Sequence, residues 1–271
     1  LRINAGKIRK ARYWSKALLL LTLGKKISKS INKFFPGISF DLIIAPTPPI
    51  TLSGIFKDLK KKYNASFYLL LKDIWPQGSV DLGVFKKYGI IWFFLRFHEK
   101  RIYKAANYIG AMSPLNVEYL LENNKYLPSS KVEVCSNSIS PSIIAEETNT
   151  QNIRKKYGIP YDTCVFIFSG NLALGHGIDF LINAIKYLTE YNQAFFLVGG
   201  SGTHLKHFNS CFKEGSSKNL LIYDWLPKED FDLLLRTSDV GLILLDRKFS
   251  IPQFPSRLLS YLDAGKPVLC A

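Results

Sequence analysis

The second half of the chain alternates apolar runs of strand length with segments of helical periodicity, and this order constrains the fold more than any other feature. We predict strands over residues 165–168, 194–198, 219–223 and 240–245, and helices over 178–189, 203–212 and 228–237. Such strand–helix–strand order is typical of a parallel sheet with helices on both faces. The predicted fold class is therefore α/β, with a doubly wound parallel sheet.

Residues 254–271 predict a short helix that begins after a loop and leads into a further strand. Pro255 favours an extended residue before it, Ser256 is a favourable N-cap, and Gly265 followed by Pro267 ends the helix. Backbone N–H groups near Ser256, with Arg257 beside them, would bind an anion at the helix start. We interpret this stretch as a seat for a diphosphate.

The first half has the same α/β character. We predict strands over 40–45, 67–71, 108–112 and 131–135, and helices over 52–63, 83–107 and 114–123. A polar stretch then indicates a linker, so we place a first domain at 1–138, a linker at 139–152 and a second domain at 153–271. The chain starts with Leu, and its last strand begins three residues before the end. We therefore expect elements of the complete protein to be missing at both ends.

The positive charge lies almost entirely in the first half. Residues 1–150 contain 23 Lys and Arg against 10 Asp and Glu, a net charge of +13, whereas residues 151–271 contain 13 against 11. A basic surface of this kind suits anionic lipid or nucleic acid, and a solvated basic face is the plainer alternative. No apolar run approaches the ~20 residues that span a bilayer.

Residues 90–97 combine aromatic and aliphatic side chains, with Lys86 and Lys87 before them and Lys100 and Arg101 after them. This composition is typical of a helix at a membrane interface. A core helix is the alternative, because consecutive apolar residues cover every face of a helix.

Four cysteines, Cys135, Cys164, Cys211 and Cys270, show no spacing typical of metal ligands. Three of them lie in or beside predicted strands. We interpret all four as reduced thiols in the core of a cytosolic protein.

Three loops of the second half, at residues 169–177, 199–202 and 246–257, follow predicted strands and therefore meet at one edge of the sheet. Their small residues let backbone N–H groups approach a phosphate. Ordinary glycine turns explain each loop singly, but three together favour phosphate binding. Trp225 and Leu226 are candidates for an apolar wall against a flat base, and a buried core tryptophan is the alternative.

Asp73 and His98 are the candidate catalytic residues of the first half, since a reacting proton or a sugar hydroxyl needs such a polar partner. Asp73 follows a predicted strand, at the edge where open α/β sheets bind ligands. A capping aspartate and a hydrogen-bonded surface histidine are the alternatives.

Six motifs occur in an order and spacing that resemble one family. They are Lys72-Asp-Ile-Trp-Pro76, Val134-Cys-Ser-Asn-Ser-Ile139, Ser169-Gly-Asn171, Val198-Gly-Gly-Ser-Gly202, Tyr223-Asp-Trp-Leu-Pro227 and Pro255-Ser-Arg-Leu-Leu-Ser-Tyr-Leu-Asp-Ala-Gly-Lys-Pro267. With these motifs the chain resembles GT-B glycosyltransferases of family 4, especially bacterial N-acetylfucosamine transferases of O-antigen and capsule synthesis.

The resemblance implies two Rossmann-like domains facing a cleft, with the acceptor on the basic first domain and a nucleotide sugar on the second. It also implies a retaining reaction that needs no metal and no cofactor beyond a UDP-sugar donor. The diphosphate would contact Arg257 and also Arg247 or Lys248. The candidate donor-binding residues are Gly170, Asn171, His176, Gly177, Gly200, Trp225, Leu226, Pro255, Ser256, Arg257 and Ser260.

The sequence departs from the family pattern at two sets of positions. The two glutamates that the family places eight residues apart fall on Pro252 and Ser260, and the basic residues of its first glycine loop fall near Asn171 and His176. We therefore expect donor contacts that differ from those of better-known members, with a decayed, inactive domain as the alternative.

We predict a glycosyltransferase that moves an N-acetylated sugar from UDP to a lipid-linked saccharide in bacterial surface polysaccharide synthesis. It would lie on the cytoplasmic face of the cytoplasmic membrane, attached through the basic first half, and would bind no nucleic acid. The alternatives are a GT-B sugar-nucleotide epimerase and a non-enzymatic protein that binds anionic surfaces or nucleic acid.

Overall fold

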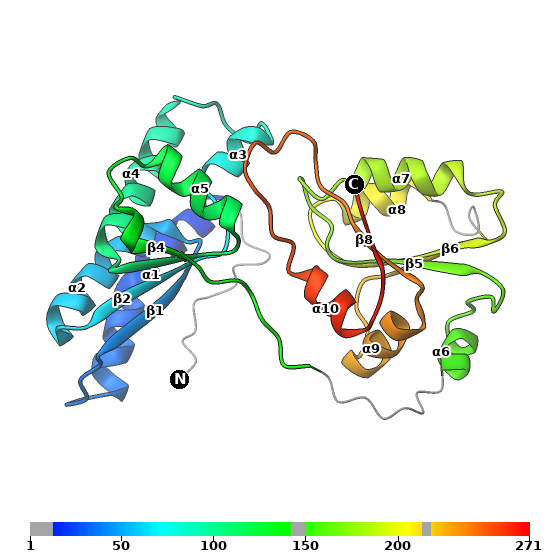
Figure 1. The fold of residues 1–271 in the computed structure, drawn as a ribbon, viewed down its shortest axis with the longest axis horizontal. Helices are drawn as coiled ribbons and strands as arrows, with labels where there is room; N and C mark the ends of the chain where they lie inside the picture. The colour runs from blue at the N-terminus through cyan, green and yellow to red at the C-terminus, as the bar shows by residue number, and fades with distance from the viewer. Residues whose placement is uncertain (1–12, 142–149, 213–217) are drawn as a thin grey trace. The chain divides into compact units, whose positions relative to one another are not determined.

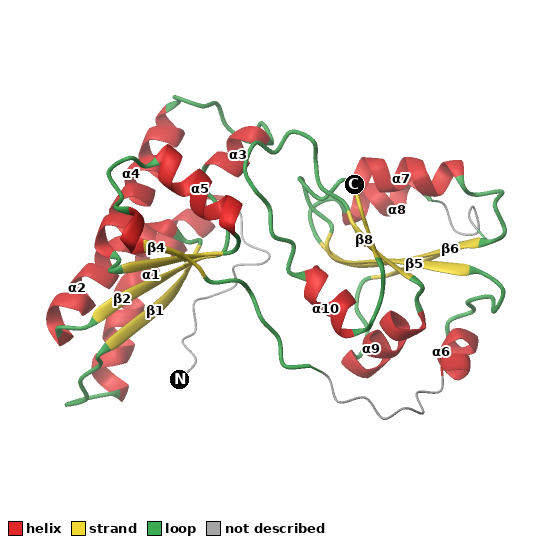
Figure 2. Cartoon of the chain, viewed as in Figure 1, coloured by secondary structure: helices red, strands yellow, loops and turns green. Residues whose placement is uncertain are grey.

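The computed structural model describes residues 13–141, 150–212 and 218–271 (Figure 1). The chain divides into two compact units, in which helices and strands alternate (Figure 2). The first unit contains residues up to 136 together with 250–254, and the second contains 137–249 and 255–271. Each unit has a parallel sheet of its own, which confirms the predicted α/β fold class.

The sheet of the first unit has the strand order β1-β2-β3-β4, and all neighbours are parallel. Alternate residues of β2, namely Phe67, Leu69 and Leu71, are buried, and the ring of Phe56 lies 4.9 Å from that of Phe67. The strands are β1 (Leu42–Thr47), β2 (Ser66–Leu71), β3 (Tyr108–Ala111) and β4 (Val132–Val134); the helices are α1 (Tyr13–Phe34), α2 (Ser53–Tyr63), α3 (Gln77–Asp81), α4 (Ile90–Ala105) and α5 (Pro114–Asn123), with short 3-10 turns at Ile50–Leu52 and Ser129–Lys131.

Two elements of the first unit differ from the prediction. β1 continues through Pro46, which is tolerated because β1 is an edge strand and one side of its backbone needs no partner. The helix predicted over 83–107 begins only at Ile90, because Gly83 and Tyr88 have φ angles of +71° and +64°, outside the helical region.

The sheet of the second unit has the order β7-β6-β5-β8-β9, again with all neighbours parallel. Its strands are β5 (Cys164–Asn171), β6 (Ala194–Ser201), β7 (Leu220–Tyr223), β8 (Val240–Ile243) and β9 (Val268–Cys270); its helices are α6 (Thr150–Lys156), α7 (Ile178–Tyr187), α8 (Leu205–Cys211), α9 (Lys228–Thr237) and α10 (Arg257–Asp263). The alternation predicted from the sequence is therefore confirmed.

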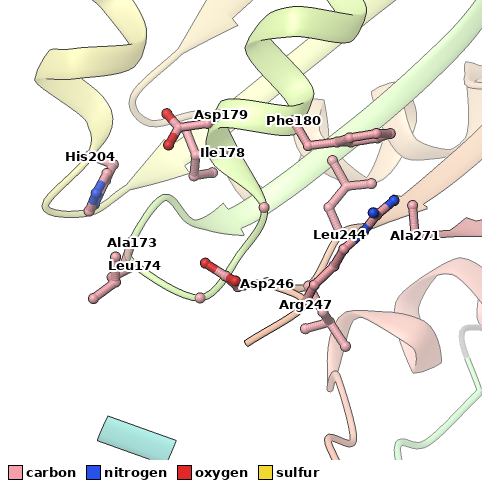
Figure 3. A pocket seen from close by; sticks show the side chains of 13 residues that line it. Ala173, Leu174, Ile178, Asp179, Phe180, His204, Leu244, Asp246, Arg247 and Ala271 are labelled. Carbon is pink, nitrogen blue, oxygen red and sulfur yellow. The ribbon is translucent and has the colours of Figure 1, made fainter. Parts of the chain in front are cut away.

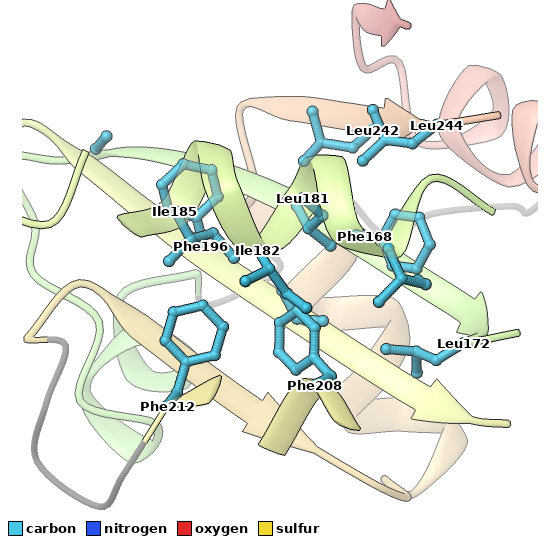
Figure 4. Close-up of a cluster of buried hydrophobic side chains, with 13 residues drawn as sticks. Phe168, Leu172, Leu181, Ile182, Ile185, Phe196, Phe208, Phe212, Leu242 and Leu244 are labelled. Atoms are coloured by element: carbon cyan, nitrogen blue, oxygen red, sulfur yellow. The ribbon is translucent and has the colours of Figure 1, made fainter. Parts of the chain in front are cut away.

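The core of the second unit lies on both faces of its sheet, because successive side chains of a strand point to opposite sides. Phe168 and Phe196 belong to the cluster that includes residues of α7 and α8 (Figure 4). Their neighbours Ile167 and Leu197 belong to the opposite cluster, which includes residues of α9 and α10. Burial on both faces explains why these strands are almost wholly apolar in sequence.

Close packing explains two of the glycines that the sequence suggested for phosphate binding. β5 and β6 extend through Asn171 and Ser201, so residues 169–171 and 199–201 are strand and not loop. A Cβ on Gly200 would lie 1.7 Å from the carbonyl oxygen of Gly170, and a Cβ on Gly199 would lie 1.7 Å from the ring of Tyr223. These glycines allow neighbouring strands and side chains to approach each other.

The segment 250–254 is grouped with the first unit, which the sequence did not suggest. Ser250 donates hydrogen bonds to the carboxylate of Asp81 from its backbone N–H (2.8 Å) and its hydroxyl (2.9 Å). The side-chain amide of Asn116 donates to the carbonyl oxygen of Pro252 at 2.9 Å. Most of the linker predicted at 139–152 lies outside the described residues, and its last three residues belong to α6.

The cysteines are free thiols, but the prediction that they lie in the core is wrong. Cys164 and Cys270 are exposed, and Cys135 and Cys211 are half-buried. Cys164 begins β5 and Cys270 ends the edge strand β9, positions that the covering helices do not enclose. Within the described residues, no helix combines the length and apolar character needed to cross a bilayer.

We expect Gly200→Ala to destabilise the second unit by about 2–3 kcal/mol, because the new methyl group must displace the backbone of β5. The matched control is Gly265→Ala. Gly265 also has a positive φ (+66°), but a Cβ there would meet nothing within 4 Å. The control should cost only the conformational strain of about 1 kcal/mol. Urea unfolding of both variants checks this, and equal losses of stability would contradict the packing argument.

Candidate functional site

The candidate site lies at the carboxyl ends of β5 and β8. From the central strand β5, the chain adds β6 and β7 on one side and β8 and β9 on the other. The loops that follow β5 and β8 therefore leave the sheet edge in opposite directions, and parallel sheets bind ligands at such a switch point.

Arg257 is the main charged group at this edge. Its guanidinium carbon lies 4.4 Å from the ring centroid of Phe168, the buried aromatic residue of β5. Its Nη2 lies 3.2 Å from the position that a Cβ of Gly170 would occupy, so only a glycine fits there without displacing it. Its Nη1 is buried and has no hydrogen-bond partner among the described residues. Burial lowers the pKa of the guanidinium, which nevertheless stays charged because arginine is so basic.

His176 lies beside this arginine in the loop that follows β5. Burial and the nearby charge of Arg257 both lower the pKa of its imidazole. Its Nδ1 is buried and has no partner among the described residues. The guanidinium of Arg257 and the imidazole of His176 each have one buried nitrogen without a partner among the described residues. Together they can bind an anionic group by donating hydrogen bonds to it.

A cavity of about 350 Å³ opens at the same switch point (Figure 3). The residues that line it come from the loop after β5, the start of α7, the segment after β8, His204 and the residue after β9: Ala173, Leu174, Gly175, Gly177, Ile178, Asp179, Phe180, His204, Leu244, Leu245, Asp246, Arg247 and Ala271. Gly177 is the N-cap of α7 with φ +56°, and a Cβ on it would lie 2.9 Å from that of Leu244. The start of α7 therefore packs closely against the end of β8.

Both signs of charge line this cavity. Asp246 is held in place because its carboxylate accepts a hydrogen bond from the backbone of Lys248 (3.0 Å) and its own N–H donates to Gly175 (3.0 Å). Asp179, at the first turn of α7, pairs with His207 at 3.1 Å. Arg247 is the cation that lines the cavity. The carboxylates suit sugar hydroxyls, which donate hydrogen bonds, whereas Arg247 suits phosphate; Arg257 is not one of the lining residues.

The sequence missed Tyr261, which holds α10 on the sheet. Its side chain is fully buried, and its hydroxyl oxygen lies 3.1 Å from the carbonyl oxygens of both Ile167 and Leu242. A Cβ on Gly241 would lie 2.5 Å from the tyrosine ring, so the ring fits only against a glycine. Because Tyr261 lies one turn after Arg257, it positions that arginine. The only sequence signal was the helical spacing of the two residues.

The start of α10 differs from the prediction. Ser256 has helical φ and ψ angles and its side chain makes no capping hydrogen bond, so its predicted role as a side-chain cap is wrong. The N–H groups of Leu258 and Leu259 bond to the carbonyl oxygens of Pro255 and Ser256, at 3.1 and 3.2 Å. Two of the backbone N–H groups that were expected to bind a phosphate are therefore already bonded within the first turn. The prediction of an anion site now depends on the side chain of Arg257.

The other candidate donor residues lie on the same unit. Gly170 and Asn171 end β5, Gly200 is near the end of β6, and Ser260 lies in α10. The core alternative for Trp225 is wrong, because its side chain is 78% exposed after the end of β7. Leu226 packs partly into the cluster that contains Tyr261. An exposed indole next to an anchored leucine is compatible with a platform for a base.

Asp73 and His98 lie in different surroundings within the first unit. Asp73 follows β2 as predicted, and desolvation raises the pKa of its carboxyl. His98 lies in the middle of α4, where its ring packs against those of Phe94 (4.6 Å) and Phe97 (5.5 Å). Burial and Arg101 lower the pKa of its imidazole. No hydrogen bond joins Asp73 and His98 in the described part of the chain.

Two parallel α/β units of this kind define the GT-B glycosyltransferase fold, and solved structures share it. The chain aligns over 98% of its length with a glycosyltransferase from Rickettsia africae ESF-5, with a TM-score of 0.62, 16% identity and coverage of 64% of that chain. It aligns over 97% with Anabaena Alr3699/HepE, solved in complex with UDP and glucose, with a TM-score of 0.66, 15% identity and coverage of 64% of that chain.

Residues 149–271 match the model of the family described as glycosyl transferases group 1. This match covers most of the second unit and less than half of the chain. The chain is 26% identical over 233 residues to the probable glycosyltransferase WbjE of Pseudomonas aeruginosa, which covers 84% of the chain and 56% of that relative. The chain thus spans little more than half the length of this relative.

We expect acid to destabilise the second unit through His176. The pKa of His176 is lowered in the folded state, so the unfolded chain binds a proton more readily. The contribution of His176 to stability is therefore present above the ordinary histidine pKa of about 6.5 and is lost as the pH falls below it. The loss of melting temperature between pH 7 and pH 5 should be smaller in His176→Gln. His207→Gln, which removes an exposed imidazole, is the control. A titration by NMR that places the pKa of His176 at or above 6.5 would refute this.

Proposed function

We propose that the protein is a retaining, metal-independent glycosyltransferase that moves an N-acetylated sugar from a UDP donor to a lipid-linked saccharide. The reaction would belong to the synthesis of a bacterial surface polysaccharide such as O-antigen or capsule. The second unit would bind the donor, and the basic first unit would bind the acceptor. The protein would act at the cytoplasmic face of the membrane, attached to anionic lipid through its first unit.

The observation that carries this proposal is the buried guanidinium nitrogen of Arg257, which has no hydrogen-bond partner among the described residues and lies in the part of the chain that matches the glycosyl transferases group 1 model. An unpaired buried cation is costly, and a diphosphate at that place would remove the cost. His176 beside it can donate a hydrogen bond to a phosphate, whose negative charge would raise the pKa of the imidazole. The cavity next to them has carboxylates that suit the hydroxyls of a sugar.

Pro252 and Ser260 occupy the positions of the two family glutamates, so other side chains would have to contact the donor. Pro252, at the first of these positions, is grouped with the first unit through its carbonyl oxygen, and Ser260 replaces the second in α10. Asp246 and Asp179 then become the candidates for the hydroxyl contacts that the glutamates would supply.

The alternatives are less well supported. An epimerase would turn over the UDP-sugar without an acceptor, and the relatives named above are described as glycosyltransferases. A non-enzymatic binder of nucleic acid or anionic surfaces would leave the unpaired groups of the second unit without a role. Turnover of UDP-sugars with and without a lipid acceptor separates these possibilities.

We expect Arg257→Gln to weaken UDP binding by about tenfold to a hundredfold, because it removes a charge-assisted hydrogen bond to a phosphate. Arg257→Lys should recover only part of the affinity, since it restores the charge without the planar fork. The matched control, Lys206→Gln, removes an exposed cation of α8 and should bind as the wild type does. Calorimetric titration with UDP measures all three, with circular dichroism melting to check folding. Unchanged affinity in a folded Arg257→Gln protein would overturn the proposed donor site.

A further inference from the structure

Within the described residues, helix α4 presents to solvent an apolar stripe that no other element covers. Ile90, Phe94 and Phe97 follow one another at helical spacing, and their side chains are 90%, 49% and 55% exposed. Phe93, next to this stripe, is 58% exposed. The opposite face of the helix carries Leu95, Glu99, Ile102 and Tyr103, all of them buried. The sequence left a core helix and an interfacial helix open, and the exposed face shows that the helix is amphipathic and covered on one side only.

The same stripe continues into cations. Arg101 and Lys104 follow Phe97 at spacings of four and seven residues, so they extend the exposed face towards the end of α4. The guanidinium of Arg101 lies 5.4 Å from the ring centroid of Phe97. One face of the helix is thus apolar in its first half and basic in its second half.

A basic hollow adjoins this second half, where α4 packs against α2. It has a volume of about 640 Å³ and is lined by Ser53, Lys57, Lys60, Lys61, Asn64, Ala65, Arg101, Lys104 and Ala105. Five of these residues are cations and none is acidic. Lys57, Lys61, Arg101 and Lys104 are exposed, and none of them forms an ion pair with a carboxylate in the described part of the chain.

Lys60 and Lys131 show how strongly the positive charge is concentrated at this end of the sheet. Lys60 donates to the carbonyl oxygen of Ala105 at 3.2 Å, and Lys131 donates to that of Lys104 at 3.3 Å. Desolvation and the charge of Lys60 both lower the pKa of Lys131. The carbonyl groups at the end of α4 therefore hold Lys60 and Lys131 close to the hollow. An anion bound in the hollow would reduce the repulsion between these two cations.

We propose that the α4 stripe and the basic hollow form one docking surface for an anionic phospholipid membrane. The hollow receives phosphate headgroups, and Ile90, Phe94 and Phe97 enter the boundary between headgroups and acyl chains. This inference rests on the proposed function, because it gives the membrane partner of that function a place on the molecule. The charge of the hollow and the apolar residues along the same helix face select a lipid surface over a soluble anion.

The position of α4 in the fold relates this surface to the acceptor. α4 connects β2 to the parallel strand β3, so it runs antiparallel to them. Its aromatic first half lies towards the carboxyl edge, where Asp73 follows β2, and the basic hollow lies at the amino edge, where Ala65 precedes β2. A lipid-linked acceptor in the membrane would thus meet the end of the helix nearest the edge that binds ligands in parallel sheets.

The test measures binding of the purified protein to phosphatidylcholine vesicles with and without 30% phosphatidylglycerol, at low and high salt. Wild type should bind the anionic vesicles only. In Lys57→Gln/Lys61→Gln/Arg101→Gln the partition coefficient should fall about a hundredfold, because each cation near an anionic surface contributes about a factor of five. Lys60 is left intact because it bonds to α4. Lys155→Gln/Lys206→Gln/Lys228→Gln, with the same net charge, is the control and should bind as the wild type does.

A second variant, Phe94→Ser/Phe97→Ser, should bind weakly and lose all binding in high salt, because only the electrostatic part remains. Equal binding of the hollow variant and its control would overturn the proposal, as would DNA binding that the hollow variant loses in parallel with vesicle binding. A dimer in sedimentation that the serine variant abolishes would assign the stripe to a second copy. All variants should bind UDP normally, so a failure here is distinct from a failure of the donor site.

Discussion

The contact between Tyr261 and Gly241 governs the candidate site. The tyrosine ring is buried only because Gly241 has no side chain, and its hydroxyl reaches carbonyl oxygens of β5 and β8 at once. This fixes the short helix α10 across the two strands between which the sheet changes direction. Arg257, one turn earlier, is thereby held over Phe168 with a nitrogen unpaired. The packing of the core therefore positions this cation.

The two units differ in how much charge they carry and in where that charge lies. The second unit is nearly neutral, and its Arg257 has a buried guanidinium nitrogen, so the low dielectric around that arginine would strengthen an interaction with phosphate. The first unit spreads its cations over the exposed surfaces of α2 and α4, where they interact weakly with single ions and additively with a charged surface. Under the two proposals, burial would separate recognition of a diphosphate from attachment to a membrane surface.

Some parts of this structure were predictable because they depend on local patterns. The strands of the second unit are buried on both faces, so their apolar runs predicted them, and α5 and α9 have the predicted bounds. The role of Ser256 was not predictable, since residues that suit an N-cap also occur in a tight first turn. Gly199 and Gly200 resembled a phosphate loop in sequence. In the structure they instead make room for Tyr223 and Gly170, which are far away in the chain and become their neighbours only through strand pairing. The cysteines were misplaced for the same reason, because exposure depends on which strand ends the helices cover.

By itself the sequence determined the class of fold, the unequal charge of the two halves and the presence of Arg257 beside a glycine-rich edge. These follow from composition and from periodicity, which are properties of neighbouring residues. Only the tertiary structure decided that Arg257 has an unpaired buried nitrogen, that Tyr261 positions it, and that the apolar and basic halves of α4 share one exposed face next to a hollow. Each of these depends on contacts between residues far apart in the chain, and burial is set by what packs against a side chain.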